Sequence, residues 1–194
     1  PGADNRATLD GVAEIAVVAN GVVTVYNVHG RQLFNVAVVG TPAGRGGPPT
    51  IADFDGDGRV EVASAGATAY SVFDMDCAGT PDPTTCPSMH TDGVLWSAVS
   101  QDRSSNVTGS SVFDFDGDGR AEAVYGDECF TRVYDGVTGN VVYSRFRRSC
   151  TWYENPVIAD VDSDFNAEII STSNTNCPGI VCPAVDPIFD GIQC

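Results

Sequence analysis

Short stretches of alternating hydrophobic and polar residues recur along the chain, separated by turns rich in glycine, asparagine and proline. A stretch such as Val60-Glu61-Val62-Ala63 has the period of two that is typical of a strand, not of a helix. Turn residues such as Asn20-Gly21 separate the stretches. The pattern predicts strands at about 14–19, 22–27, 32–38, 50–53, 60–65, 69–74, 93–98, 111–114, 121–125, 130–135, 140–144, 157–160 and 167–172.

One acidic stretch occurs three times, as loop 1 (53–61), loop 2 (114–122) and loop 3 (160–168), each between two predicted strands. Each loop has carboxylates at positions 1, 3, 5 and 9, and the first two have glycine at position 6. Carboxylates at this density repel one another unless a cation neutralises them, and oxygen ligands suit calcium.

The loops begin like an EF-hand loop but do not end like one. An EF-hand needs a bidentate glutamate at position 12, where this chain has Ser64, Tyr125 and Ser171. The last acid stands at position 9 instead, and a strand follows it.

A strand, the motif D-x-D-x-D-G-x-x-[DE] and a second strand together resemble the FG-GAP/VCBS repeat of integrin-like β-propellers. The resemblance covers most of the chain. It implies an all-β fold of three to four four-stranded antiparallel blades, and calcium in the loop that joins the first two strands of a blade. The side-chain ligands that it implies are Asp53, Asp55, Asp57 and Glu61; Asp114, Asp116, Asp118 and Glu122; and Asp160, Asp162, Asp164 and Glu168. The backbone carbonyls of Arg59, Arg120 and Asn166 would add a ligand at position 7.

Loop 3 departs from the motif because Ser163 and Phe165 stand where the other loops have glycine. Phe165 must adopt the sharp turn that Gly58 adopts easily, so we expect the third site to be the weakest of two to three calcium ions. The alternative is that the loops are acidic surface turns without metal.

The acids Asp10, Asp57, Asp118 and Asp164 recur at spacings of 47, 61 and 46 residues, as expected for blades of four short strands. The predicted division is four blades at about 1–39, 40–99, 100–150 and 151–176, followed by a cysteine-containing extension at 177–194. Three or four blades leave two open edges. We therefore expect the remaining blades to come from the same chain or another, or copies of the chain to associate.

The net charge is −16, from 26 acids and 10 bases that are all arginine. Such a chain should not bind nucleic acid or adsorb to anionic membranes, because both need a basic surface. No apolar run is long enough to insert into a membrane.

Seven cysteines indicate an oxidising compartment, and thus a secreted or cell-surface protein. Proximity along the chain predicts the disulfides Cys77–Cys86 and Cys177–Cys182. The ends of neighbouring antiparallel strands predict Cys129–Cys150, which leaves Cys194 over. Asn106 begins a glycosylation sequon, a motif that is common by chance.

The loop between the third and fourth blades is a possible ligand face. In the family, such loops lie opposite the calcium loops; Trp152, Tyr153, Glu154 and Arg103 would lie there, with Arg45. The alternative for Trp152 is packing between blades. Arg145, Arg147 and Arg148 form either a basic patch or a solvated edge.

The sequence supports no catalytic site: the two histidines are isolated, and no serine has a histidine partner. We therefore expect a non-enzymatic calcium-binding module for adhesion, ligand binding or surface architecture, with a protein or glycan partner. The alternatives are a building block of a filament or shell, or an accessory domain of a polysaccharide-active enzyme.

Overall fold

The computed structural model describes residues 12–41 and 45–191, and all regular structure in these ranges is β-strand. The prediction of an all-β fold with thirteen strands is confirmed over these residues. The strands are β1 (Glu14–Ala19), β2 (Val22–Asn27), β3 (Gln32–Ala37), β4 (Thr50–Ala52), β5 (Glu61–Ala65), β6 (Ala69–Ala78), β7 (Asp92–Val99), β8 (Ser110–Phe113), β9 (Glu122–Gly126), β10 (Phe130–Tyr134), β11 (Val141–Phe146), β12 (Val157–Ala159) and β13 (Glu168–Ile170). No helix among the described residues could span a membrane.

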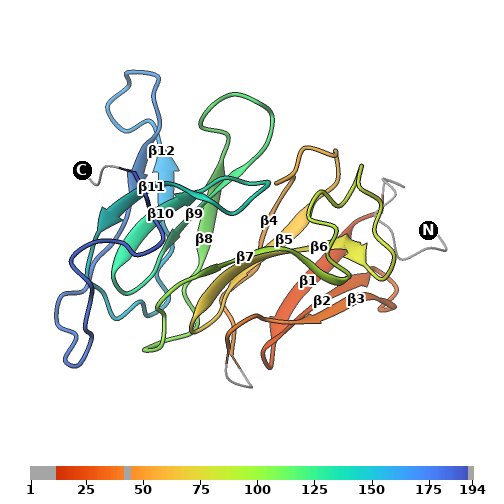
Figure 1. Cartoon of the computed structure of the whole chain (residues 1–194), viewed down its shortest axis with the longest axis horizontal. Coiled ribbons are helices and arrows are strands. Elements are labelled where there is room, and N and C mark those ends of the chain that lie inside the picture. Colours follow the sequence, from red (N-terminus) through yellow and green to blue (C-terminus); the bar gives the residue numbers. More distant parts are fainter. Residues whose placement is uncertain (1–11, 42–44, 192–194) are drawn as a thin grey trace.

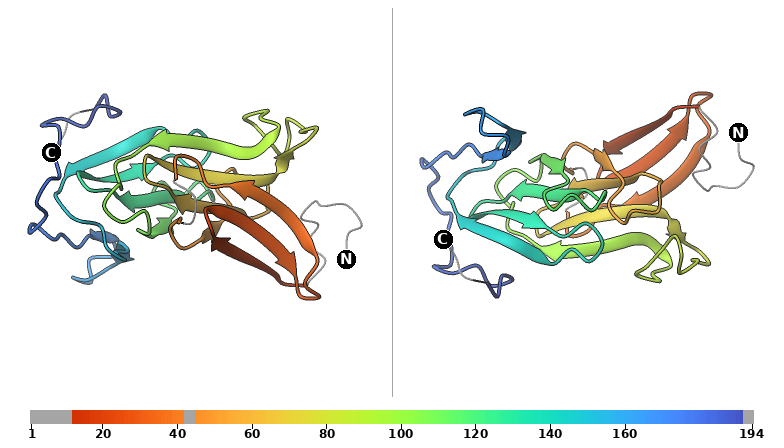
Figure 2. Two further views of the ribbon diagram at one scale, coloured as in Figure 1. Left: turned by 90° about the horizontal axis from the view of Figure 1, so that it is seen from below. Right: turned by 90° about the horizontal axis from the view of Figure 1, so that it is seen from above.

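The strands form four antiparallel sheets in which chain neighbours pair: β1-β2-β3, β4-β5-β6-β7, β8-β9-β10-β11 and β12-β13. The sheets follow one another along the long axis of the molecule, with the first and fourth at opposite ends (Figures 1 and 2). Strand β8 lies against both β4 and β12. The hydroxyls of Thr50 and Ser110 lie 2.8 Å apart, and Ser111 donates to the Pro156 carbonyl. The first strands of the second, third and fourth sheets are therefore neighbours.

An aromatic cluster fills the space between the second and third sheets. The rings of Tyr70 and Tyr125 stack 4.7 Å apart, and the Tyr134 ring lies 5.4 Å from Tyr70. Trp96 is buried here and donates its indole N–H to the Gly136 carbonyl at 2.6 Å. Such aromatic pairs add about 0.5–1.5 kcal/mol each beyond the burial of their area.

A second, aliphatic cluster joins the first and second sheets, with Val25 and Phe34 packed among the side chains of Val62 and Phe73. The second sheet therefore covers Val25 of the first sheet. On β1 it is instead Ile15 and Val17, among others, that are exposed.

One predicted disulfide is present and two are wrong. Cys77 and Cys86 are bonded as expected, closing the loop between β6 and β7. Cys129 pairs with Cys182, and Cys150 pairs with Cys177. Cys194 lies outside the described residues.

The observed pairing follows from the path of the chain after β11. Phe146 opposes Phe130 at the end of the β10–β11 pair, so Cys150 lies beyond the strand and does not face Cys129. The segment 172–191, here called the C-terminal strap, instead runs back over the third sheet and brings Cys177 and Cys182 to these positions (Figure 1).

A buried ionic cluster anchors the C-terminal strap to β10. Arg132 contacts Asp186 of the strap through Nε at 2.5 Å and Nη2 at 3.0 Å, and Asp127 through Nη1 at 2.6 Å. The Ser144 hydroxyl also donates to Asp186, at 2.6 Å. These side chains exclude water, so each charge depends on its partner.

Candidate metal loops and a recess on the opposite side

The three acidic loops share one hydrogen-bonded conformation. In loop 1, both oxygens of Asp53 accept backbone N–H groups, from Gly56 at 2.7 Å and Gly58 at 3.0 Å. Glu61 accepts the Phe54 N–H at 2.7 Å, which ties the end of the loop back to its start. The corresponding bonds recur in loops 2 and 3. All three loops project from one side of the molecule, the upper edge of Figure 1.

The turn within each loop requires two residues with positive φ. Gly56 and Gly58 have φ of 80° and 84°, where a residue without Cβ is unstrained. In loop 3, Ser163 and Phe165 have φ of 66° and 70°, so Phe165 does adopt the turn that was expected to strain it. Its ring is 98% exposed and packs against nothing that would offset the strain.

The loops bring part of each expected ligand set together within 4.8 Å. The groups are Asp53, Asp55 and Asp57; Asp114, Asp116 and Glu122; and Asp160, Asp162 and Glu168. The acids outside these groups have other partners. Glu61 is buried against the Phe54 N–H, Asp118 lies 3.3 Å from Arg120, and Asp164 accepts the Asn166 N–H.

Loop 1 shows most clearly that its acids fit a cation. Burial raises the pKa of Glu61 to about 9 and that of Asp55 to about 6, and neighbouring carboxylates add to both shifts. One oxygen of Asp55, Oδ2, is buried without a hydrogen-bond partner. An unpaired buried carboxylate oxygen is costly, and a hard divalent cation would satisfy it. The donor set therefore fits a hard divalent cation.

Two acids of β6 extend the acidic group of loop 1, and the sequence pattern missed them. Burial raises the pKa of Asp74 to about 7, and the charges of Asp76 and Asp55 raise it further. Asp76 forms an ion pair with Arg59 of the loop. In the sequence they appear as two acids separated by one residue, and they lie in β6, the strand that pairs with β5 at the end of loop 1. Asp74 also lies close to Cys77 and Cys86, but their sulfurs form a disulfide and offer no thiolate.

The residues of the expected ligand face separate into three places. Trp152 and Tyr153 are 57% and 66% exposed and line a recess with Arg45. Arg103 lines a different recess, beside Gln101 and Pro183. Trp152 therefore does not pack between sheets.

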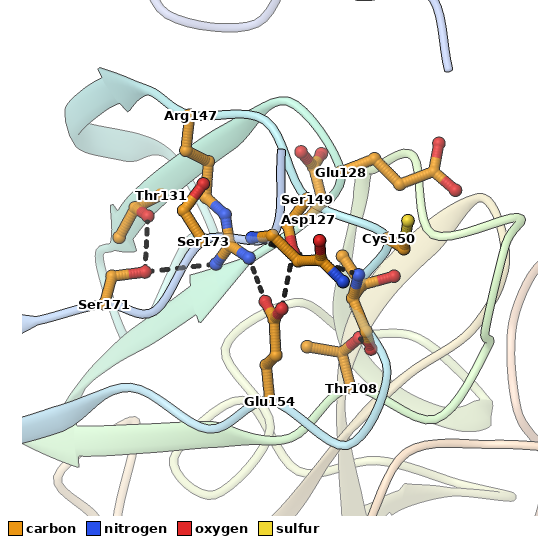
Figure 3. A network of polar contacts seen from close by, with 12 residues as sticks. Thr108, Asp127, Glu128, Thr131, Arg147, Ser149, Cys150, Glu154, Ser171 and Ser173 are labelled. Carbon is orange, nitrogen blue, oxygen red and sulfur yellow. Dashed lines mark hydrogen bonds and ion pairs between the residues drawn. The ribbon is translucent and has the colours of Figure 1, made fainter. Parts of the chain in front are cut away.

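Glu154 points inward and belongs to a polar network (Figure 3). It forms an ion pair with Arg147 and accepts a hydrogen bond from Ser149. Arg147 also donates to Ser171 at 3.0 Å and is buried against Gly126, where any side chain would collide with its guanidinium. The expectation of a basic patch or a solvated edge is therefore wrong for Arg147.

The structure also shows the surroundings of the sequon asparagine and of one of the two histidines. Asn106 of the sequon is buried in a left-handed turn with φ of 59°, so the folded chain does not present its amide to solvent. The Nδ1 atom of His90 lies 2.9 Å from the Val94 carbonyl.

Comparison with known proteins identifies no family: no family model matches the chain, and no curated protein does. Among solved structures, the chain is similar to part of the Vibrio cholerae biofilm matrix protein Bap1. The match has a TM-score of 0.49 and 30% identity, and it covers 59% of this chain and 17% of that protein. The chain thus spans under a fifth of its neighbour.

Proposed function

We propose that the chain is a calcium-stabilised β-propeller segment of a secreted or cell-surface protein, with a binding or architectural role. The observation that carries the proposal is the common conformation of the three acidic loops, together with the unpartnered Asp55 Oδ2 in loop 1. The neighbouring first strands β4, β8 and β12 support an arrangement of the sheets as blades. Three disulfides support an extracellular location.

Calcium would act by neutralising the acids and joining the two strands that flank each loop. Phe54 connects loop 1 to the core. It belongs to the loop, and its side chain is fully buried in the aromatic cluster between the second and third sheets. Calcium binding to loop 1 would therefore also stabilise this cluster. Loop 1 also contacts loop 2, since the Ala121 N–H donates to the Asp53 carbonyl at 3.0 Å. Ordering one loop therefore stabilises its neighbour and the core beneath.

A structural role for the cation fits better than a catalytic one. Calcium takes about 6–8 oxygen ligands, and the acids of each loop with one backbone carbonyl would occupy most of these positions. A self-associating building block is the second candidate. It is favoured by the exposed apolar side chains Ile15 on β1 and Ile170 on β13, at opposite ends of the molecule.

Thermal unfolding with and without calcium tests the proposal. A ligand at a hundredfold excess over its dissociation constant stabilises the folded state by about 2.7 kcal/mol per site. We expect calcium to raise the melting temperature of the chelated protein, and Asp55→Asn to reduce the rise. The control is Asp190→Asn, which removes one exposed charge outside the loops. An unchanged melting temperature in calcium and in chelator would contradict the proposal.

A further inference from the structure

A recess lies at the strand ends opposite the acidic loops, between segments that adjoin all four sheets. Its lining comes from the end of β1 and from the loops that precede β4, β8 and β12. The lining residues are Val18, Ala19, Asn20, Arg45, Gly46, Val107, Trp152 and Tyr153. The recess has a volume of about 280 Å³, slightly below the roughly 300–1,000 Å³ of pockets for drug-sized ligands. It therefore suits one small ring better than a long peptide.

Two aromatic rings stand exposed over this recess. Trp152 and Tyr153 make an edge-to-face pair with ring centroids 5.0 Å apart. The other tryptophan, Trp96, is buried in the core. Exposed large aromatic side chains that lie side by side commonly mark a binding surface, because each offers an apolar face with a polar edge.

The aromatic pair is held on both sides by buried polar contacts. Before it, the Thr151 hydroxyl donates to Asp102, and the Thr151 carbonyl accepts from Ser105 at 2.8 Å and Thr108 at 2.7 Å. After it, Glu154 is fixed by the network of Figure 3. A site held in place loses little conformational entropy when a ligand binds.

The backbone of the pair is also in a sparsely populated conformation. Thr151 and Tyr153 have φ of 53° and 51°, and Asn20 across the recess has φ of 54°. Residues held at positive φ are strained and cluster at ligand sites, where surrounding contacts maintain them.

Arg45 gives the recess a positive charge in a chain of net charge −16. Its guanidinium donates through Nη1 to the Ser105 carbonyl at 2.8 Å, and it makes no ion pair with any other described residue. No carboxylate lines the recess within the described ranges. A guanidinium in this position is suited to a carboxylate ligand, which it binds in a forked geometry.

We propose that this recess binds an acidic sugar residue of a polysaccharide. A pyranose ring has an apolar C–H face that packs on Trp152 or Tyr153, hydroxyl groups that reach Asn20 and backbone groups, and a carboxylate that pairs with Arg45. A peptide anchor would need a deep apolar pocket that excludes water, and these rings are too exposed to form one. The proposal names a partner for the proposed surface role, but it uses residues on the side opposite the acidic loops.

Binding of trigalacturonate, with neutral galactotriose as the matched probe, tests the proposal. Only Trp152 and Trp96 contribute tryptophan fluorescence, so a change on titration that Trp152→Phe abolishes reports on this recess. In calorimetric titrations, which do not depend on Trp152, we expect trigalacturonate to bind, and Trp152→Ala and Arg45→Gln each to weaken it at least about tenfold, which corresponds to about 1.4 kcal/mol. Galactotriose should bind at least tenfold more weakly, as expected if the carboxylate contact matters.

Matched variants separate this site from other surfaces. Arg103→Gln removes an exposed arginine of another recess, and Tyr143→Ala removes an exposed tyrosine of β11; both should bind like the parent. Titrations of trigalacturonate in a calcium chelator exclude binding through a bridging calcium ion. They also test sugar binding in the recess independently of calcium binding in the acidic loops. Absent binding, equal binding of the neutral sugar, or equal losses in the control variants would each overturn the proposal.

Discussion

At the scale of single residues, the acidic loops depend on backbone conformations that only some residues adopt without strain. Glycine supplies the two positive φ angles in loops 1 and 2, whereas loop 3 uses Ser163 and Phe165. The sequence predicted this strain because the three loops align position by position. It did not predict that Asp74 would join loop 1, because that contact depends on the pairing of β5 with β6.

Replacing Phe165 by glycine should therefore stabilise the fold. A left-handed conformation costs an L-residue about 1–2 kcal/mol, and glycine loses roughly 0.5–1 kcal/mol more in unfolded-chain entropy. We expect a net gain of up to about 1 kcal/mol, since the exposed ring buries nothing. Urea denaturation measures it. Val161→Gly is the control: it changes an exposed residue of the same loop that lacks positive φ, and it should destabilise. Loss of stability in Phe165→Gly would contradict the strain.

At the scale of elements, the strands could be predicted and the C-terminal strap could not. Strand alternation and turn residues are local signals, so the predicted strand positions agree with the structure. The strap has no periodic pattern, and its position depends on two distant disulfides and on the contact between Asp186 and Arg132. Cysteines close together in the sequence, such as Cys177 and Cys182, therefore gave the wrong pairs.

The anchor of the strap predicts a dependence of stability on pH. Burial alone would raise the pKa of Asp186, but hydrogen bonds from Arg132 and Ser144 and the charge of Arg132 outweigh it and lower the pKa. The contribution of Asp186 is thus present above the unfolded-state pKa of about 3.9 and is lost as the pH falls through the folded-state pKa. Asp127 and Tyr134 are the other titratable groups that contact Arg132.

Asp186→Asn should destabilise the protein at neutral pH by about 3 kcal/mol, the low end for breaking a buried pair, since Asp127 still pairs with Arg132. The difference from the parent should be constant down to about pH 5 and shrink below about pH 4. Denaturant unfolding as a function of pH measures it, with Asp190→Asn as the exposed control. A difference that persists unchanged into strong acid would show that Asp186 contributes through packing and not through its charge.

At the scale of the whole molecule, the acidic loops lie on one side and the aromatic recess on the other, with the packed sheets between them. Each sheet depends on its neighbours for burial, as the aromatic and aliphatic clusters show. The sequence could place the loops because a calcium motif is contiguous. It also placed Trp152, Tyr153 and Arg45 on one face, but it could not add Asn20 and Val107 or exclude Glu154 and Arg103, because the recess residues come from four separate segments.

Native mass spectrometry of the chelated protein titrated with calcium tests the central claim most directly, because it counts bound ions. We predict up to three calcium ions, with the third bound more weakly. Asp55→Asn, Asp116→Asn and Asp162→Asn should each remove one ion, and Asp190→Asn none. A parent protein that binds no calcium, or loop variants that bind as many ions as the parent, would contradict the account.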